Sequence, residues 1–249
     1  MTRRALLPAL ILGLALPAVA AGGIPSPRVS GANLAESALL RSRKLMPDSL
    51  RQILERRETI LLRGFREPGR PADLDAARRE LEAALAEQRL MLAGFPHFDD
   101  IVANFGRIAR AVCELNALRR YCTDVQAPAW LDDYEPYMER KGALFVPVFY
   151  DYSPLLFTER NLPAYIDLIG ERNRDYAARV IDLYRRGGSS RTFDDRSPAF
   201  GLAALHYSHT ITDVANVWLY CWREANGDLG GVPFFPYSAA KPTREKNGR

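Results

Sequence analysis

Hydrophobic residues recur with a helical period along almost the whole chain from Asn33 onward, and this repeat is the strongest constraint on its fold. Over residues 50–61, leucine and isoleucine return at spacings of three, four and seven, which places them on one face of a helix. Clusters of glycine and proline divide the repeat into segments of several helical turns. The sequence therefore predicts an all-α protein, a single-domain helical bundle of about five to seven helices.

Proline and glycine also predict where the longer helices begin and end. Pro47-Asp48-Ser49 is a suitable helix start, because proline fits the first turn and Asp or Ser can cap it. The helix that follows is expected to end at Gly64, before Pro68-Gly69. Further helices are expected over residues 73–92, 98–119, 161–186 and 197–227.

The segment 121–160 is less regular and contains four prolines. Residues 143–150 are aromatic and β-branched enough for a strand, but Pro147 stands in the middle and cannot donate a ladder hydrogen bond. We expect a buried connecting segment there rather than a sheet.

The first residues have the anatomy of a secretory signal peptide. Arg3 and Arg4 precede an apolar run over residues 5–16, and small residues follow Pro17. That run is short for a bilayer span, which needs about 20 apolar residues. The predicted organisation is a signal peptide at 1–21, an extended leader at 22–32, a helical domain at 33–228 and an irregular basic tail at 229–249. We expect a periplasmic or secreted protein with no transmembrane helix in the mature chain.

The charge balance favours no particular macromolecular partner. The formal net charge is +4, and it falls to about +2 once Arg3 and Arg4 leave with the signal peptide. Much of the remaining excess lies in residues 241–249, which we interpret as a solvated end. The sequence thus carries no specific nucleic-acid signal.

Three cysteines, Cys113, Cys122 and Cys221, are an odd number for an exported chain. They permit one disulfide and one free thiol, and the sequence does not give their pairing. Cys113 stands inside a strongly helical pattern, where a small buried hydrophobe is the better interpretation.

The last predicted helix carries a stripe of side chains with metal-binding chemistry. His209 and Asp213 are four residues apart and His206 lies three residues before His209, so they share one helix face. An imidazole and a carboxylate at this spacing can hold one zinc ion. The alternative is a hydrogen-bonded polar stripe within a bundle. The third histidine, His97, follows a proline and is interpreted as a surface residue at a helix start. No Gly-x-Ser-x-Gly, Walker or Cys-x-x-Cys motif offers a competing chemistry.

Four short stretches of the chain are similar to stretches of one known family. They are Met46-Pro47-Asp48-Ser49-Leu50, Phe105-Gly106-Arg107-Ile108, Asn116-Ala117-Leu118 and the segment from Trp218 to Trp222. These stretches resemble bacterial members of the zinc-dependent phospholipase C / nuclease P-one superfamily, over residues 33–228. The resemblance implies a helical fold and hydrolysis of phosphate esters. It also implies a His-x3-Asp-x5-His metal triplet on one helix and a His-x3-acid pair on a later helix.

In this chain the spacing of the family's ligands is kept, but most of the ligands are replaced. Arg110 stands at the position of the first triplet histidine, Glu114 replaces the aspartate, and Arg120 replaces the second histidine. His209 and Asp213 match the later pair. The family's cluster of three zinc ions uses more histidine ligands than the three histidines of this chain, so a trinuclear centre is excluded.

Arginine stands at two of the family's ligand positions, which indicates that guanidinium charge replaces the charge of the metal ions. A guanidinium does not bind metal, but it can form two hydrogen bonds to a carboxylate. We expect Arg110 and Arg120 to pair with Glu114 and Asp213, which would keep buried acids satisfied. The alternative for Arg110 and Glu114 is an ordinary exposed ion pair.

Three hypotheses of function follow. The first is an exported, catalytically degenerate relative of the superfamily that acts by binding or structurally, with no cofactor. The second is a phosphoester hydrolase, phospholipase C or nuclease-like, with a single zinc held by Glu114, His209, Asp213 and His206. In that hypothesis Arg110 or Arg120 clamps the phosphate. The third is an unrelated helical bundle. We favour the first, with a small molecule or a phosphoester as ligand.

Overall fold

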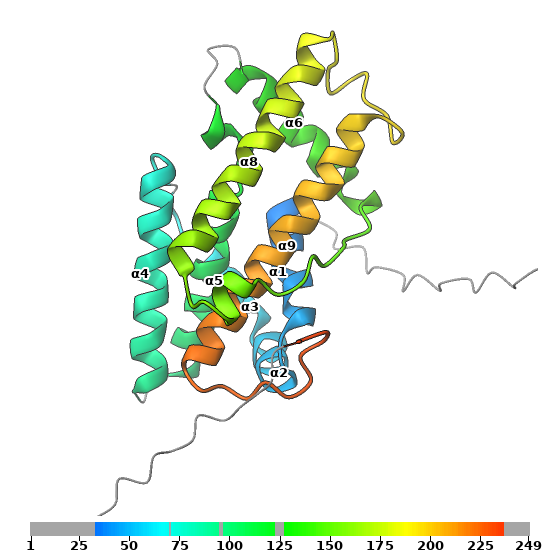
Figure 1. The fold of residues 1–249 in the computed structure, drawn as a ribbon. Coiled ribbons are helices and arrows are strands. Elements are labelled where there is room, and N and C mark those ends of the chain that lie inside the picture. The colour runs from blue at the N-terminus through cyan, green and yellow to red at the C-terminus, as the bar shows by residue number, and fades with distance from the viewer. Residues whose placement is uncertain (1–32, 70, 95–96, 123–126, 237–249) are drawn as a thin grey trace, which may run out of the picture.

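The computed structural model describes residues 33–69, 71–94, 97–122 and 127–236, and this part of the chain is built from helices, with no strand (Figure 1). The longer helices are α4 (Leu74–Ala93), α5 (Phe98–Leu115), α6 (Ala127–Lys141), α8 (Leu162–Arg185) and α9 (Pro198–Glu224). The shorter ones are α1 (Leu34–Ser42), α2 (Asp48–Arg56), α3 (Glu58–Phe65) and α7 (Pro154–Phe157). Short 3₁₀ turns lie at Arg43–Leu45, Leu118–Tyr121 and Gly142–Leu144. The prediction of an all-α protein is confirmed.

The described residues form nine α-helices, more than the five to seven predicted. The helix expected from Asp48 to Gly64 is divided into α2 and α3, because Arg57 leaves the helical conformation with φ −119° and ψ 32°. The helix α6 forms although Pro136 lies inside it. Proline removes a helical hydrogen bond, but Pro136 and Asp132, whose carbonyl loses its donor, are both exposed to water.

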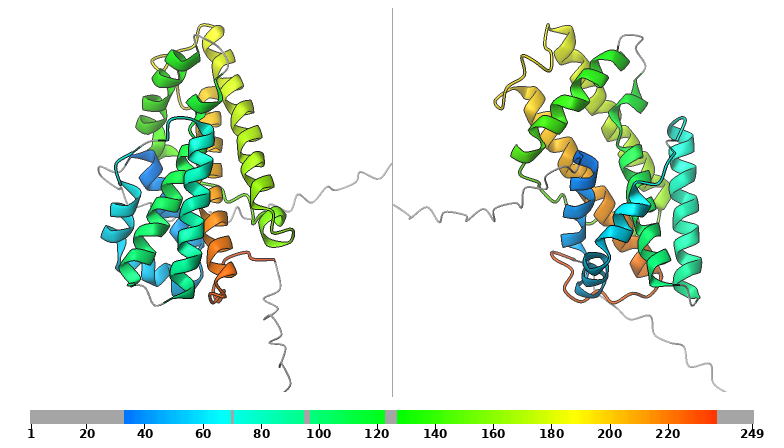
Figure 2. Two further views of the ribbon diagram at one scale, coloured as in Figure 1. Left: turned by 90° about the vertical axis from the view of Figure 1, so that its left-hand side faces the viewer. Right: turned by 180° about the vertical axis from the view of Figure 1, so that it is seen from behind.

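The helix α9 is the central element of the molecule (Figures 1 and 2). Its start follows the predicted signal, since the Ser197 side chain accepts a hydrogen bond from the N–H of Phe200 and Pro198 occupies the first turn. Every residue from Thr210 to Cys221 is buried, as expected of a helix that is enclosed on all sides. Neighbouring helices on different sides, α1, α5 and α8 among them, pack against α9.

The helices α3 and α5 cross at two glycines. A Cβ atom added to Gly64 would lie 1.9 Å from the carbonyl oxygen of Ala103, and one added to Gly106 would lie 2.2 Å from that of Leu61. The two backbones can therefore approach this closely only with glycine at both positions. The crossing holds α5 against α3, while α4 packs on another side of α5 (Figure 2).

Two hydrophobic clusters share α9. The first includes Leu54, Phe105 and Trp218, and the indole N–H of Trp218 donates to the carbonyl oxygen of Phe105 at 2.9 Å. The second lies among α6, α8 and the first half of α9 and includes Tyr134, whose hydroxyl donates to the carbonyl oxygen of Ala199 at 2.7 Å. The two halves of α9 thus belong to different clusters.

An extended segment, residues 145–153, connects α6 to α7 and crosses over α9 (Figure 1). Side chains of α9 hold it in place: Ser208 accepts the N–H of Val148 at 3.1 Å, and Thr212 accepts that of Tyr150 at 3.2 Å. The prediction of a connecting segment without a strand is confirmed. The prediction that it is buried is wrong on its outer side, where Val146 is 81% exposed.

No helix in the described ranges is long and apolar enough to cross a membrane. The predicted signal peptide at 1–21, the leader at 22–32 and residues 237–249 of the tail lie outside the described residues. The remaining tail, residues 229–236, is irregular as predicted. Leu229, Val232 and Phe235 pack it against the first cluster.

Candidate functional site

The two helices that carry the predicted site residues lie side by side. The Nδ2 atom of Asn116, at the end of α5, donates to the carboxylate of Asp213 on α9 at 3.0 Å. About three turns earlier on α5, the packing of Trp218 on Phe105 joins the same two helices. The expectation that α5 and α9 are neighbours is confirmed.

Asp213 is buried, with 1% of its surface exposed, and it accepts hydrogen bonds from three side chains. Besides Asn116, the hydroxyl of Tyr165 donates to it at 2.8 Å, and the guanidinium of Arg172 forms an ion pair with it. Burial and the charge of Asp213 raise the pKa of Tyr165 well above its ordinary value, so the hydroxyl remains a donor. The prediction that Arg110 or Arg120 neutralises Asp213 is wrong, because Arg172 of α8 does so.

The two arginines at the triplet positions have separate partners. Arg120 forms an ion pair with Glu114 and also donates to the carbonyl oxygen of Pro71 at 3.0 Å, so one of the two predicted arginines does pair with one of the two predicted acids. Arg110 instead pairs with Glu80 of α4 and donates to the carbonyl oxygen of Glu67 at 2.5 Å. The predicted pairing of Arg110 with Glu114 or Asp213 is therefore wrong, because α4 supplies a nearer carboxylate.

His206 is 8% exposed, and its Nε2 lies 2.7 Å from the carbonyl oxygen of Asn116. A carbonyl only accepts, so Nε2 carries the proton and Nδ1 is left as an acceptor. Nδ1 is buried and has no hydrogen-bond partner among the described residues. Burial lowers the pKa of His206 to about 4, against the opposing effect of its hydrogen bond to Asn116. The imidazole is therefore neutral at neutral pH.

His209 packs in an aromatic stack. Its ring lies 4.0 Å from that of Tyr150, with 9° between their planes, and 6.0 Å from that of Tyr176. Burial, with the charge of Arg172, lowers the pKa of His209 to about 4. His209 and Asp213 thus share a helix face in sequence but have different partners in space.

The four residues proposed as zinc ligands do not form one coordination set. Asp213 is enclosed by its three donors, Glu114 is paired with Arg120, and His209 is stacked on Tyr150. Across the ranges that the structure describes, no group of three or more His, Cys, Asp or Glu side chains is arranged to hold a metal ion. His97 starts α5 and is exposed, as predicted.

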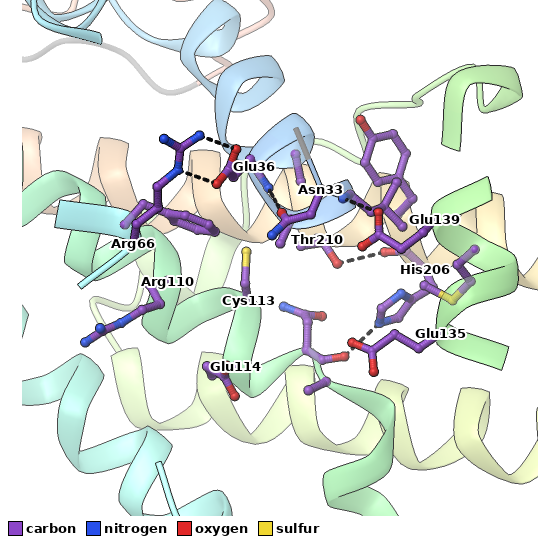
Figure 3. Close-up of a pocket in the computed structure, with 18 of the residues that line it drawn as sticks. Asn33, Glu36, Arg66, Arg110, Cys113, Glu114, Glu135, Glu139, His206 and Thr210 are labelled. Carbon is purple, nitrogen blue, oxygen red and sulfur yellow. Dashed lines mark hydrogen bonds and ion pairs between the residues drawn. The ribbon is translucent and has the colours of Figure 1, made fainter. Parts of the chain in front are cut away.

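A cavity of about 470 Å³ lies among α1, the ends of α3 and α5, α6 and α9 (Figure 3). Three predicted site residues lie on its wall: Arg110 and Glu114 come from α5, and His206 comes from α9. The carboxylates on the wall are Glu36, Glu67, Glu114, Glu135 and Glu139, and the guanidinium groups are those of Arg66, Arg110 and Arg119. In Figure 3 the side chains of Glu135, Glu139 and His206 lie together on one side of the cavity, and Arg110 and Glu114 lie on the other.

The carboxylates of this cavity differ in how they are neutralised. Glu36 is buried and forms two hydrogen bonds with Arg66, at 2.6 and 2.8 Å. Glu139 accepts only the backbone N–H of Leu34, at 2.7 Å, and Glu135 makes no hydrogen bond or ion pair within the described part of the chain. Partial burial, with the charges of Glu135 and Glu36, raises the pKa of Glu139.

The carboxylates of α1 and α6 were not predicted as site residues. Glu135 and Glu139 do stand four residues apart, a spacing that places them on one helix face. The prolines at 128 and 136 led to an irregular segment being expected there. The helical spacing of two acids is the signal that would have found them.

No disulfide joins the three cysteines, all of which lie in the described ranges. Cys113 lies on the wall of the cavity, where burial and the charges of Glu114 and Asp213 raise its thiol pKa to about 12. A thiol with so high a pKa is protonated and a poor nucleophile. Cys113 thus contributes no chemistry to the cavity as it stands.

No family model, no curated protein and no solved structure matches the chain. Function is therefore inferred from the residues of the site.

Proposed function

We propose that the protein is an exported, non-catalytic relative of the zinc-dependent phospholipase C / nuclease P-one superfamily that binds a small molecule in the cavity among α1, α5, α6 and α9. The cavity itself carries this proposal. Its volume of about 470 Å³ lies within the range usual for small-molecule sites, and its wall combines apolar surface with a few convergent polar groups.

The ion pairs around the cavity support binding rather than metal-dependent hydrolysis. A metal site needs carboxylates and imidazoles with free lone pairs that converge on one point. Here Glu114 is paired with Arg120, and Asp213 with Arg172, so two of the proposed ligands already have a cationic partner. Fixed guanidinium groups thus supply the charge that dications would supply in the family.

Export is proposed from the sequence. A basic start, an apolar run and a small-residue stretch precede the helical domain in the order that a signal peptide requires. Expression of the full chain in a Gram-negative host, followed by fractionation and N-terminal sequencing, tests this. We expect a periplasmic product that begins near residue 22. A product that keeps Met1 and stays in the cytoplasm would contradict export.

A bound small molecule is tested with a variant that fills the cavity. Ala117 lines the cavity, whereas Ala86 is exposed on α4 and lies outside it. We expect native mass spectrometry of the exported protein, or thermal shift with a library of polar metabolites, to reveal a ligand for the wild type and for Ala86→Trp. Ala117→Trp should lose it while keeping its helical circular dichroism. If no compound binds the wild type, or if Ala117→Trp binds equally, the proposed function fails.

Metal analysis decides between this proposal and the reduced one-zinc hydrolase. We expect protein purified without chelator to contain far less than about one zinc per chain and to leave bis(p-nitrophenyl) phosphate intact. Stoichiometric zinc, together with a phosphodiesterase activity that Glu114→Gln abolishes, would establish the hydrolase instead.

A further inference from the structure

We propose that the ligand of this cavity is a small organic cation with N–H donors, a primary ammonium or a guanidinium, bound between Glu135, Glu139 and His206. This inference rests on the proposed function, since it names the class of molecule that the same cavity accepts.

The first observation is an excess of unneutralised acid on one wall. Glu36 and Glu114 have arginine partners, but Glu135 and Glu139, one turn apart on α6, have none among the described residues. Like charges at this spacing repel each other. A cation placed between the two carboxylates removes that repulsion, whereas an anionic ligand would increase it.

The second observation is independent of the acids. The Nδ1 atom of His206 is a buried acceptor without a donor, on a side chain that lines the same cavity. The hydrogen bond between Nε2 and the carbonyl oxygen of Asn116 fixes this tautomer, so Nδ1 cannot become the donor of the neutral ring. Buried polar atoms are nearly always hydrogen-bonded. The missing partner must therefore be a donor, which excludes a carboxylate or a fully ionised phosphate at this point.

The third observation concerns the shape of the ligand. Apolar side chains, those of Phe65, Met138 and Tyr207 among them, share the wall with the carboxylates. They suit a short hydrocarbon portion attached to the charged nitrogen. Nδ1 of His206 requires an N–H donor from the ligand. A quaternary ammonium has no N–H, so it can neutralise the two carboxylates but cannot donate a hydrogen bond to the histidine.

Four small probes distinguish the requirement for positive charge from the requirement for an N–H donor. They are n-butylammonium, 1,4-diaminobutane, tetramethylammonium and butyrate. We expect calorimetric titration of the mature protein to show binding of the two amines, weaker binding of tetramethylammonium and no binding of butyrate. The double variant Glu135→Gln/Glu139→Gln should weaken n-butylammonium by about tenfold or more. The matched control, Glu171→Gln/Asp175→Asn, changes two acids with the same spacing on α8, outside the cavity, and should bind like the wild type.

The outcomes distinguish this inference from the proposed function. If butyrate or a neutral metabolite binds and the amines do not, the cation is wrong and small-molecule binding stands. If tetramethylammonium binds as tightly as n-butylammonium, the role of His206 is overturned. If the α6 variant and the α8 control variant lose n-butylammonium affinity equally, the loss reflects only the change in net charge. That result would also overturn the proposed cation site at Glu135 and Glu139. If nothing binds, the proposed function fails with it.

Discussion

Asp213 and Arg172 form one of the two most enclosed ion pairs in the described part of the chain, the other being Arg120–Glu114. The side chain of Asp213 is 1% exposed and that of Arg172 is 17% exposed. The carboxylate also accepts from Tyr165 and Asn116, so its charge is fully compensated by its surroundings. Removing one partner of such a pair leaves an uncompensated buried charge, which is far more damaging than losing an exposed pair.

We therefore expect Arg172→Met to lower the free energy of unfolding by about 3–5 kcal/mol. The control is Arg179→Met on the same helix, which removes an exposed ion pair with Asp175 and should change stability by less than about 1 kcal/mol. Urea titration followed by circular dichroism measures both. Equal effects of the two substitutions would show that Asp213 does not depend on Arg172 for its charge compensation.

Ion-pair partners were easier to predict when the two residues are close in the sequence. The Arg120–Glu114 pair joins residues only six apart, on α5 and on the short turn that follows it, so the two are near each other whatever the packing of the other helices. The partners of Arg110 and Asp213 come from α4 and α8, and which side chains meet there depends on how each helix is rotated about its axis. Helical periodicity gives the buried face of a helix, but not which neighbour faces each residue on it.

At the scale of elements, the crossing of α3 and α5 is the tightest helix contact that the glycines reveal. The atoms nearest an added Cβ at Gly64 and Gly106 are backbone atoms, which cannot move aside as a flexible side chain can. Overpacking a core usually lowers stability by about 1–3 kcal/mol, and a rigid neighbour places the effect at the upper end.

We expect Gly106→Ala and Gly64→Ala each to lower the free energy of unfolding by about 3 kcal/mol. Gly201→Ala is the matched control, because a Cβ at this exposed position of α9 meets nothing within 4 Å. That substitution should raise stability by about 0.5–1 kcal/mol through higher helix propensity. Thermal unfolding of the three variants gives the comparison. Stabilisation by Gly106→Ala would mean that α3 and α5 do not approach as closely as described.

Element boundaries were predictable where local capping determines them. Ser197 and Pro198 begin α9 as predicted, and Pro47 stands immediately before α2. The break at Arg57 and the continuity of α6 through Pro136 were not predictable, because both depend on tertiary packing and on which side of a helix faces water. The cavity was missed for the same reason, since its acids lie on a helix that the prolines obscured.

At the scale of the whole molecule, α9 links the two hydrophobic clusters and carries two neutral histidines. Ile211 belongs to the second cluster and His206 packs on Tyr176 of that cluster, while Val214 and Trp218 belong to the first. A charge introduced on the buried part of α9 therefore affects the helix on which both clusters depend. Protonation of His206 or His209 introduces such a charge, next to the guanidinium of Arg172.

This arrangement predicts how stability changes with pH. The pKa of each histidine is lowered to about 4 in the folded protein from an ordinary value of 6.5, so between these values the unfolded chain binds more protons. The contribution of the two neutral histidines to the free energy of unfolding is fully present above about pH 6.5, and it is lost as the pH falls toward 4. We expect the free energy of unfolding in urea to decrease from about pH 7.5 to about pH 5.5, a range above the titration of most carboxylates.

Two substitutions test whether the histidines cause this dependence of the free energy of unfolding on pH. His209→Gln should make the decrease shallower, because one proton fewer is taken up on unfolding, whereas His97→Gln changes an exposed residue and should leave the slope unaltered. A wild-type stability that stays constant over this range would contradict the lowered pKa of the two histidines on α9. Because α9 belongs to both clusters, the loss should appear as one cooperative transition. Circular dichroism of the whole molecule and alkylation of Cys221 in the first cluster should then report the same midpoint at each pH.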